Sequence, residues 1–247
     1  MNKIVIKNVS LFSQSKLFSM KKILFVILIN CLTYAQSGVV MYETISKKYL
    51  ENNKNSENAS KDVTDLLKLI ENTSLEVTLN FNSQTSYFFI DDKRNNSEIK
   101  TTETISRLLM EFNITYTVLK DSSVYQLIDN VLVHNKIKLN WKIENESKKI
   151  DDYICYKATL VEKYKNRMNE EKQKTVVAWF CPEIPYSFGP NEYYGLPGLI
   201  LELEKDENKY VAKKITLSKE TIAIELPKKK VISKEEYSKK LKANSQF

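Results

Sequence analysis

The chain has 247 residues, of which 42% are hydrophobic and 28% are charged, with only 4 glycines and 5 prolines. This composition is typical of a globular protein and excludes a disordered chain and a polytopic membrane protein. The sequence has one histidine, His134, and it lacks a GxSxG motif, a phosphate-binding glycine loop and a CxxC pair. Because histidine-based metal sites and catalytic triads need several partners, we expect no catalytic residue, no metal site and no cofactor.

The first 35 residues have the features of a secretory signal peptide. They contain five lysines and no acidic residue, and the unbroken apolar run Ile23–Ile29 follows two of these lysines. Met20, which directly precedes Lys21 and Lys22, is an alternative start residue. The small residues Thr33 and Ala35 predict cleavage after Ala35. The apolar run is shorter than the roughly 20 residues that span a bilayer, so we expect no transmembrane span in the mature chain. Without the leader the formal net charge falls from +7 to +2, with 33 basic against 31 acidic residues, which argues against nucleic-acid binding.

The remainder of the chain, residues 38–247, is predicted to form one domain. Alternating apolar and polar residues predict strands over residues 39–45, 75–81, 87–90, 114–120, 124–130, 131–136, 137–144, 153–164, 175–180, 199–204, 210–217 and 221–224. Apolar stripes predict helices over residues 60–71 and 105–112, and the capping box that begins at Ser233 predicts a basic helix over residues 234–242. The expected fold is mainly β: a single curved, mostly antiparallel sheet or partly closed barrel with two or three short helices.

Two polar features lie in the strand-rich part of the chain and near its end. His134 is interpreted as a solvated or hydrogen-bonded residue of a strand. The run Lys228-Lys229-Lys230 is a solvated surface in one interpretation and a contact with anionic lipid in another.

Two cysteines, Cys155 and Cys181, remain after removal of the leader. An antiparallel hairpin centred on Met168 places residue 155 opposite 181, 157 opposite 179 and 159 opposite 177. Directly opposed cysteines in an antiparallel pair come close enough to bridge, and exported proteins encounter oxidising conditions. We therefore predict a disulfide, with two buried free thiols as the alternative.

Glycine and proline are concentrated in one short segment that is also rich in aromatic residues. Three of the four glycines and four of the five prolines lie between residues 182 and 198. Prolines end the preceding strand, and Leu196-Pro197-Gly198-Leu199 is compatible with a type II turn. The candidate residues for an interaction with a partner or ligand, called the predicted interaction segment, are Trp179, Phe180, Tyr186, Phe188, Gly189, Pro190, Tyr193, Tyr194, Gly195, Leu196, Pro197 and Gly198.

This segment has two interpretations. In the first, the loop packs against the sheet and its aromatic side chains form part of the core. In the second, the loop presents an aromatic surface to a partner or ligand, because rigid loops lose little entropy on binding and Trp and Tyr are frequent hot spots.

The hexapeptide Gly195-Leu196-Pro197-Gly198-Leu199-Ile200 resembles the motif that names the GLPGLI family of exported Bacteroidota proteins. The resemblance extends to the Trp-aromatic pair at 179–180, to Ile-Pro at 184–185 and to Gly-Pro at 189–190. It also includes the Cys-x-Lys-Ala-Thr element at 155–159 and Trp-x-Ile at 141–143. The chain departs from the family pattern at Asp151 or Asp152, where glycine is usual, and at Cys181, so the resemblance does not imply the disulfide.

The resemblance implies a small cell-envelope protein, in a family often associated with genes for TonB-dependent outer-membrane receptors. We therefore expect an exported accessory or binding protein of the periplasm or outer membrane, with such a receptor or another envelope protein as its partner. One alternative is a carrier of an apolar ligand such as a lipid, held in a cavity of the curved sheet. A second alternative is a hydrolase, although adjacent acids such as Asp91 and Asp92 point to opposite faces of a strand.

Overall fold

The computed structural model describes residues 37–46, 75–90, 112–166, 168–206 and 208–244. The predicted signal peptide, the predicted helix at 60–71 and all but the last residue of the predicted helix at 105–112 lie outside these ranges. In chain order the elements are β1 (Ser37–Ser46), β2 (Glu76–Asn82), β3 (Thr85–Ile90), β4 (Ile114–Val118), the 3₁₀ turn η2 (Leu119–Asp121), β5 (Ser123–Ile128), β6 (Val131–Lys136), β7 (Lys142–Ile150), β8 (Tyr153–Lys165), β9 (Glu171–Cys181), β10 (Leu199–Lys205), β11 (Asn208–Ser218), β12 (Val231–Ser233) and α5 (Lys234–Asn244).

The twelve strands form one sheet, in the order β12-β6-β5-β4-β3-β2-β1-β11-β10-β9-β8-β7. All neighbouring pairs are antiparallel except β12 and β6, which are parallel. The predicted fold class, a mainly β protein with one curved and mostly antiparallel sheet, is confirmed, and the sheet is not closed. No helix of the described residues is long and apolar enough to cross a membrane.

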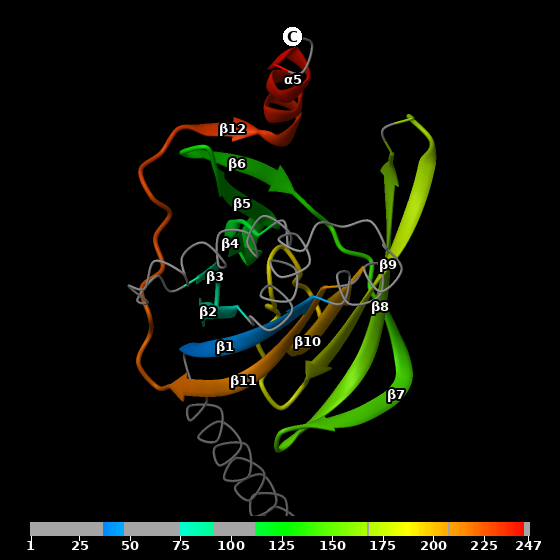
Figure 1. Cartoon of the computed structure of the whole chain (residues 1–247). Helices are drawn as coiled ribbons and strands as arrows, with labels where there is room; N and C mark the ends of the chain where they lie inside the picture. Colours follow the sequence, from blue (N-terminus) through cyan, green and yellow to red (C-terminus); the bar gives the residue numbers. More distant parts are fainter. Residues whose placement is uncertain (1–36, 47–74, 91–111, 167, 207, 245–247) are drawn as a thin grey trace, which may run out of the picture.

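The curvature of the sheet follows from the way the chain connects its two ends. β6 and β7 are consecutive in the sequence but lie near opposite ends of the strand order, and only residues 137–141 join them. Because an extended residue spans at most about 3.6 Å, this link bridges no more than roughly 20 Å. The two ends of the sheet must therefore approach each other, and Figure 1 shows the sheet curled around a concave side.

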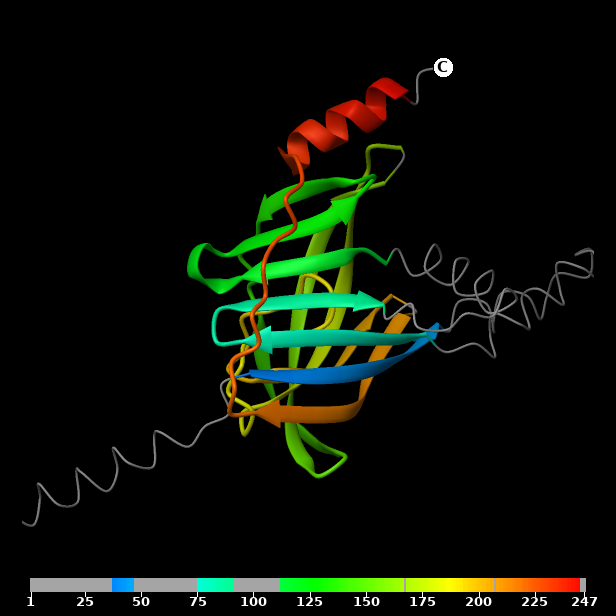
Figure 2. The ribbon, with the colours of Figure 1, turned by 90° about the vertical axis from the view of Figure 1, so that its left-hand side faces the viewer.

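Two of the predicted strands differ from the structure. The strand expected at 137–144 begins only at Lys142, because the preceding residues cross between the two ends of the sheet and Ile137 N–H donates to the Ser122 carbonyl. Residues 221–224 are not a strand but part of a strap that runs from β11 to β12 across the outside of the sheet (Figure 2). The amide of Asn82 donates to the Ile222 carbonyl at 2.9 Å and holds the strap in place.

The C-terminal helix forms where the capping box predicts it. The backbone N–H of Glu236 donates to Ser233 Oγ at 3.1 Å, which satisfies one of the otherwise unpaired amides of the first turn of α5. The prediction of a basic helix over residues 234–242 is confirmed, and the helix continues to Asn244.

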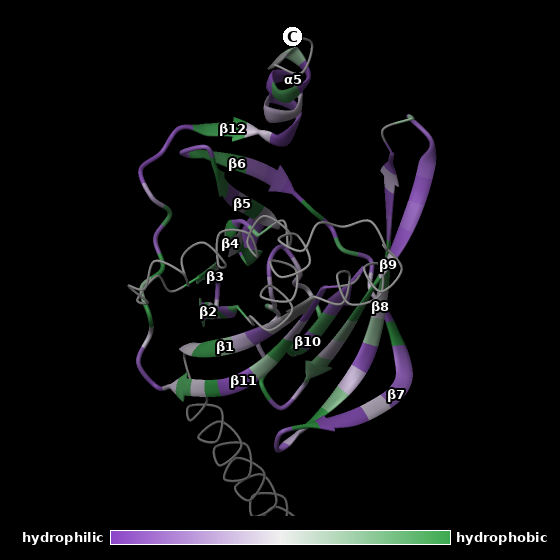
Figure 3. Cartoon of the chain, in the orientation of Figure 1, coloured by the Kyte–Doolittle hydropathy of each residue, from purple (hydrophilic) through white to green (hydrophobic). Residues whose placement is uncertain are grey.

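The hydrophobic core lies on the concave side of the sheet. Alternation along β2 directs Val77, Leu79 and Phe81 inward, and all three are fully buried. The same period of two directs Ala158 and Leu160 of β8 to this side. Edge strand β7 is mainly hydrophilic (Figure 3), as expected for a strand that must not pair with another chain.

Candidate functional site

The loop of residues 182–198 lies on the concave side and fills it with apolar side chains. Phe81 of β2 contacts Tyr186 and Phe188, with ring centroids 4.7 Å and 6.4 Å apart. The hydroxyl of Tyr42 on β1 donates to the carbonyl of Ile200, just after the loop, at 2.6 Å. The buried residues of the predicted interaction segment are Phe180, Tyr186, Phe188, Gly189, Pro190, Tyr193, Tyr194, Leu196 and Gly198.

The burial of these residues favours the first interpretation of the segment, in which its aromatic side chains belong to the core. Gly195 and Pro197 are exposed, and Trp179 is half-buried on the opposite face of the sheet, where Lys148 Nζ lies 4.2 Å from its ring centroid. The aromatic side chains of the loop are buried and do not form the exposed aromatic surface of the second interpretation.

The turn in the hexapeptide differs from the predicted type II turn. Gly198 N–H donates to the Leu196 carbonyl at 2.8 Å, which closes a three-residue γ-turn on Pro197. The amide of Leu199, which a type II turn would direct to Leu196, instead donates to the Ile184 carbonyl at 2.9 Å. The hexapeptide is therefore tied to the start of the loop, which explains why the segment 182–198 is compact.

The two cysteines lie on neighbouring strands as the hairpin geometry predicts, but they are not joined. The ladder pairs Lys157 with Trp179 and Thr159 with Val177, which confirms the predicted register. Cys155 and Cys181 lie one position beyond the end of this ladder and are buried free thiols, so the structure corrects the predicted disulfide. Cys181 still pairs with Leu199 of β10, but the β8–β9 ladder ends at the pair Tyr156 and Phe180.

His134 has the environment that the sequence suggests. Its Nε2 lies 2.9 Å from Ser123 Oγ, and its ring stacks on Tyr125 with centroids 4.7 Å apart. The prediction of a hydrogen-bonded residue is confirmed.

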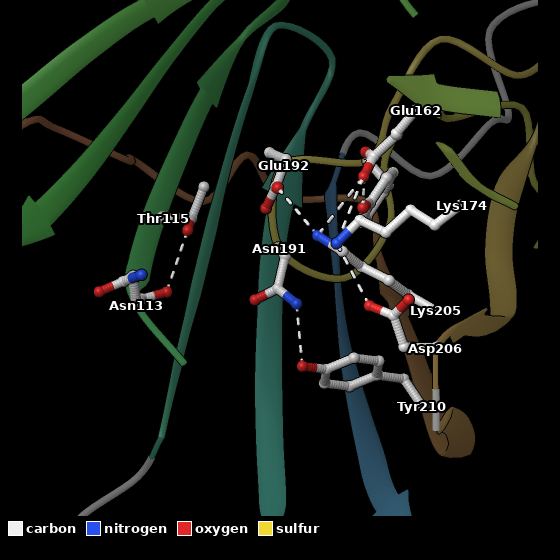
Figure 4. Close-up of polar contacts among 10 residues, drawn as sticks. Asn113, Thr115, Glu162, Lys174, Asn191, Glu192, Lys205, Asp206 and Tyr210 are labelled. Carbon is white, nitrogen blue, oxygen red and sulfur yellow. Dashed lines mark hydrogen bonds and ion pairs between the residues drawn. The ribbon is translucent and has the colours of Figure 1, made fainter. Parts of the chain in front are cut away.

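A polar cluster lies beside the loop (Figure 4). Lys174 Nζ from β9 is 3.2 Å from Asp206 and 3.9 Å from Glu162 of β8. Lys205 Nζ from β10 lies 3.7 Å from Glu162 and also 3.7 Å from Glu192 of the loop. Four segments that are distant in sequence thus bring charged groups together, and we call Glu162, Lys174, Glu192, Lys205 and Asp206 the concave cluster.

Tyrosines form the wall behind the concave cluster. The Tyr193 hydroxyl donates to Glu162 at 2.8 Å, and the amide of Asn191 donates to the Tyr210 hydroxyl at 2.9 Å. Lys205 Nζ lies 5.4 Å from the centroid of the Tyr193 ring. Burial, with smaller contributions from Glu192 and Glu162, raises the pKa of Tyr193, so its hydroxyl stays protonated and remains a donor.

Two charged groups of the concave cluster keep unused hydrogen-bonding capacity among the described residues. Lys205 and Glu192 form no hydrogen bond with any other residue among those described, and their ion pairs at 3.7 Å are too long for one. By contrast, Glu202 is buried on the opposite face of the sheet. Its carboxylate forms ion pairs with Lys148 Nζ at 2.7 Å and with Lys209 Nζ at 2.8 Å. Among the described residues, Lys205 and Glu192 therefore keep unused donors and acceptors, whereas Glu202 is held by two short ion pairs.

The concave cluster offers hydrogen-bonding groups of both kinds within a small space. Ammonium groups donate only, carboxylates accept only, and here each lies within 4 Å of the other kind. No group of three or more His, Cys, Asp or Glu side chains suited to a metal ion occurs in the described part of the chain. The cluster is therefore suited to a neutral polar ligand.

Sequence reasoning did not identify the concave cluster, although one signal was available. Glu162 continues the inward alternation of Ala158 and Leu160, and Lys174 continues that of Val176 and Ala178. If the alternation is continued beyond the last apolar residue of each strand, the side chains of Glu162 and Lys174 both lie on the concave side. Contact between these strands and Glu192, however, depends on the path of the loop, which the periodicity does not give.

Comparisons with known proteins give a partial family match and distant structural similarity. A family model described as "Protein of unknown function (Porph_ging)" matches residues 162–202, which include the hexapeptide. This match is consistent with a Bacteroidota protein but does not by itself establish the GLPGLI family. No curated protein matches the chain.

Among solved structures the chain is similar to PNGF-II in two crystal forms, with a TM-score of 0.49 and 15% identity over 83% of this chain. The aligned part is about a third of the length of PNGF-II, 33% in one form and 32% in the other. An uncharacterized conserved protein from Thermus thermophilus aligns with a TM-score of 0.34 and 7% identity, over 87% of this chain and 99% of that one. At these identities the function has to be argued from the residues of the site.

Proposed function

We propose that this protein is an exported binding protein of the cell envelope that holds a small, neutral, polar ligand at the concave cluster. The observation that carries the proposal is the pair Lys205 and Glu192, which form no hydrogen bond within the described part of the chain although both are half-buried. Partly buried charges that lack hydrogen bonds are unfavourable for stability, so their presence is better explained by a ligand that supplies the bonds.

The arrangement of donors and acceptors favours a ligand with adjacent hydroxyl groups. A hydroxyl both donates and accepts, so two neighbouring hydroxyls can bind an ammonium and a carboxylate at the same time. The carboxylates outnumber the lysines in the cluster, which disfavours an anionic ligand. The buried loop already occupies the apolar part of the concave side, so we favour a polar ligand over the apolar ligand of the carrier alternative.

The cellular setting of the proposal comes from the predicted leader and the family resemblance. Both favour export to the periplasm or outer membrane, and the resemblance favours a TonB-dependent receptor or another envelope protein as the partner. In this setting the protein is an accessory that presents its ligand to the receptor.

The test uses the mature chain, residues 36–247, and a panel of neutral hexoses, N-acetylated amino sugars and their oligomers, with fatty acids as the apolar comparison. Binding is measured by saturation-transfer NMR and calorimetry. Lys205→Met and Glu192→Gln each remove one free group and are expected to weaken binding by about tenfold to a hundredfold, because hydrogen bonds to charged groups are the stronger ones. The matched control is Lys213→Met on β11, which breaks the exposed ion pair with Glu43 at 2.7 Å and should leave binding unchanged.

Binding of a sugar that is equally strong in the Lys205 and Glu192 variants would contradict the proposed site. Binding of fatty acids alone would favour the carrier alternative, and cleavage of an oligomer during the measurement would favour the hydrolase alternative.

A further inference from the structure

The β8–β9 hairpin extends well beyond the strands on either side of it. β7 pairs with β8 only as far as Thr159, and β10 pairs with β9 only as far as Val176. The hairpin ladder continues to the pair Lys165 and Glu171, so its last part is a two-stranded ribbon with which no other described strand pairs. Figure 1 shows this ribbon standing away from the rest of the sheet.

The outer part of the ribbon combines apolar and basic side chains. Met168 at its tip is 76% exposed, and Val161 and Tyr164 are 53% and 47% exposed. A groove of about 600 Å³ lies along the ribbon, and its lining is rich in lysine: Lys163, Tyr164, Lys165, Glu171, Lys172 and Gln173. Apolar residues at a tip with lysines behind them are typical of segments that insert into the interface of a membrane.

A second basic element lies at the same end of the molecule. In Figures 1 and 2 helix α5 and the tip of the β8–β9 hairpin both extend toward the upper end, where Lys229 Nζ contacts Asn130 at 2.6 Å. Leu241 of α5 is 51% exposed, so this element also combines lysines with an exposed apolar side chain. We call residues 163–173 and 228–244 together the basic end.

The basic end has a larger positive net charge than the mature chain as a whole. Residues 163–173 contain four basic and two acidic residues, and residues 228–244 contain seven lysines and two glutamates. These segments have a formal charge of +7, whereas the mature chain has +2, so the rest of the molecule has −5. Such a separation orients a protein in front of a negatively charged surface.

We infer that the basic end binds the surface of an anionic lipid bilayer, with the tip of the β8–β9 hairpin inserted at the level of the headgroups. The inference concerns a different surface from the concave cluster and shares with the proposed function only the premise of export. Duplex DNA is also an anionic surface, but its phosphates give no favourable site for the exposed Met168 and Leu241 side chains.

The test is vesicle flotation with the mature protein. One set of vesicles contains phosphatidylcholine alone, and in the other phosphatidylglycerol replaces part of it. The double variant Lys163→Glu with Lys165→Glu reverses two groove charges, and Met168→Asp removes the apolar tip. The matched control, Lys214→Glu with Lys219→Glu, makes the same change of charge on exposed residues in and just after β11, which lies away from the basic end in Figure 1.

We expect binding to the mixed vesicles and not to phosphatidylcholine alone, and binding that weakens as salt is added. The groove variant should partition about tenfold or more less strongly, since each lysine near an anionic surface contributes to attraction and each glutamate opposes it. Met168→Asp should also bind less, and the control should bind as the parent protein does. Circular dichroism of all variants separates lost binding from lost folding.

No flotation with the mixed vesicles, or an equal loss in the control, would overturn the inference. The same holds if duplex DNA competes fully and Met168→Asp has no effect, because the basic end would then be a general polyanion site. None of these outcomes depends on whether a sugar binds at the concave cluster.

Discussion

Gly198 shows at the scale of one residue how tightly the 182–198 loop is attached to the sheet. A Cβ atom at this position would overlap the carbonyl of Cys181 and lie 2.8 Å from the nitrogen of Pro182. The neighbouring atoms belong to the backbone and cannot move aside as a side chain can. The last glycine of the hexapeptide is therefore required by the close approach of the two ends of the loop.

Gly198→Ala is expected to lower the free energy of unfolding by about 3 kcal/mol, since overpacking against backbone forces the loop to shift. The control is Gly195→Ala in the same motif. Gly195 has a φ of +92° but no atom within 4 Å of the position that a Cβ would occupy, so only backbone strain of about 1 kcal/mol is expected. Urea denaturation of both variants measures the difference, and equal destabilisation would refute the proposed overlap.

The two buried thiols allow a second prediction about individual residues. Burial, and secondarily the neighbouring Cys181, raises the pKa of Cys155 from 9.0 to about 12, and burial also raises the pKa of Cys181. The reactive form of a thiol is the thiolate, so neither residue should react with a disulfide reagent in the native protein near neutral pH. Both should react after unfolding without reductant; failure to react then would show that the two cysteines are joined.

The same pKa shift affects stability at alkaline pH. The unfolded chain loses the Cys155 proton as the pH passes about 9, whereas the native protein keeps it until about pH 12. The unfolded state thus binds fewer protons over this interval, and the free energy of unfolding falls as the pH rises through it. Cys155→Ala should reduce this alkaline loss of stability in urea titrations at several pH values.

Among the elements, the β8–β9 hairpin differs most from its surroundings, because no other described strand pairs with its outer part. Asn166 organises the turn: its side-chain oxygen accepts the amides of Met168 at 3.0 Å and Glu170 at 2.9 Å. An isolated two-stranded ribbon is marginally stable in water, so the outer part of the hairpin adds little to the stability of the sheet.

This description predicts that the hairpin can be shortened with little effect on the fold. Replacing residues 164–172 by Asn-Gly preserves the pair Lys163 and Gln173 and closes it with a two-residue turn. The free energy of unfolding should change by less than about 1 kcal/mol, because no core residue is removed. Thermal and urea denaturation provide the measurement, and a large loss of stability would mean that the ribbon supports the core.

At the scale of the whole molecule, Tyr194 links the two ends of the curled sheet. Its hydroxyl donates to the Ile137 carbonyl and lies 3.3 Å from the Ser122 carbonyl, and its own carbonyl accepts Trp141 Nε1 at 2.9 Å. These contacts hold the 137–141 link against the loop. The curvature of the sheet is therefore maintained by polar contacts of the loop as well as by the apolar core.

Tyr194→Phe should loosen this link while it preserves the ring. Loss of the hydroxyl leaves the Ile137 carbonyl without this donor, whereas the Ser122 carbonyl keeps the Ile137 N–H, and we expect a cost of about 1–3 kcal/mol. Hydrogen exchange should accelerate over residues 137–141 more than in β2 and β3. Tyr237→Phe, which removes an exposed hydroxyl bonded to Asp129 at 3.1 Å, is the control.

The sequence was sufficient to predict the strands whose apolar residues alternate, because burial on one face imposes a period of two. It also placed the hairpin register correctly from Cys155 and Cys181, although it did not show that the thiols are free. The curled shape, the path of the 182–198 loop and the meeting of Glu162 with Glu192 were not predictable. These features depend on contacts between distant segments, and no local pattern encodes them.

The position of β1 at the middle of the sheet has a consequence for how the chain is assembled. β1 pairs with β2 on one side and with β11 on the other, where Ser37 lies opposite Ser218. The two parts of the sheet on either side of the β1–β11 pair therefore cannot be joined until β11, one of the last strands in the sequence, is available to pair with β1. If the chain crosses a membrane as an extended thread, it exposes Val40 and Tyr42 until nearly all of it has passed. Such late closure makes folding slow and leaves the half-translocated chain dependent on chaperones that hold unfolded proteins.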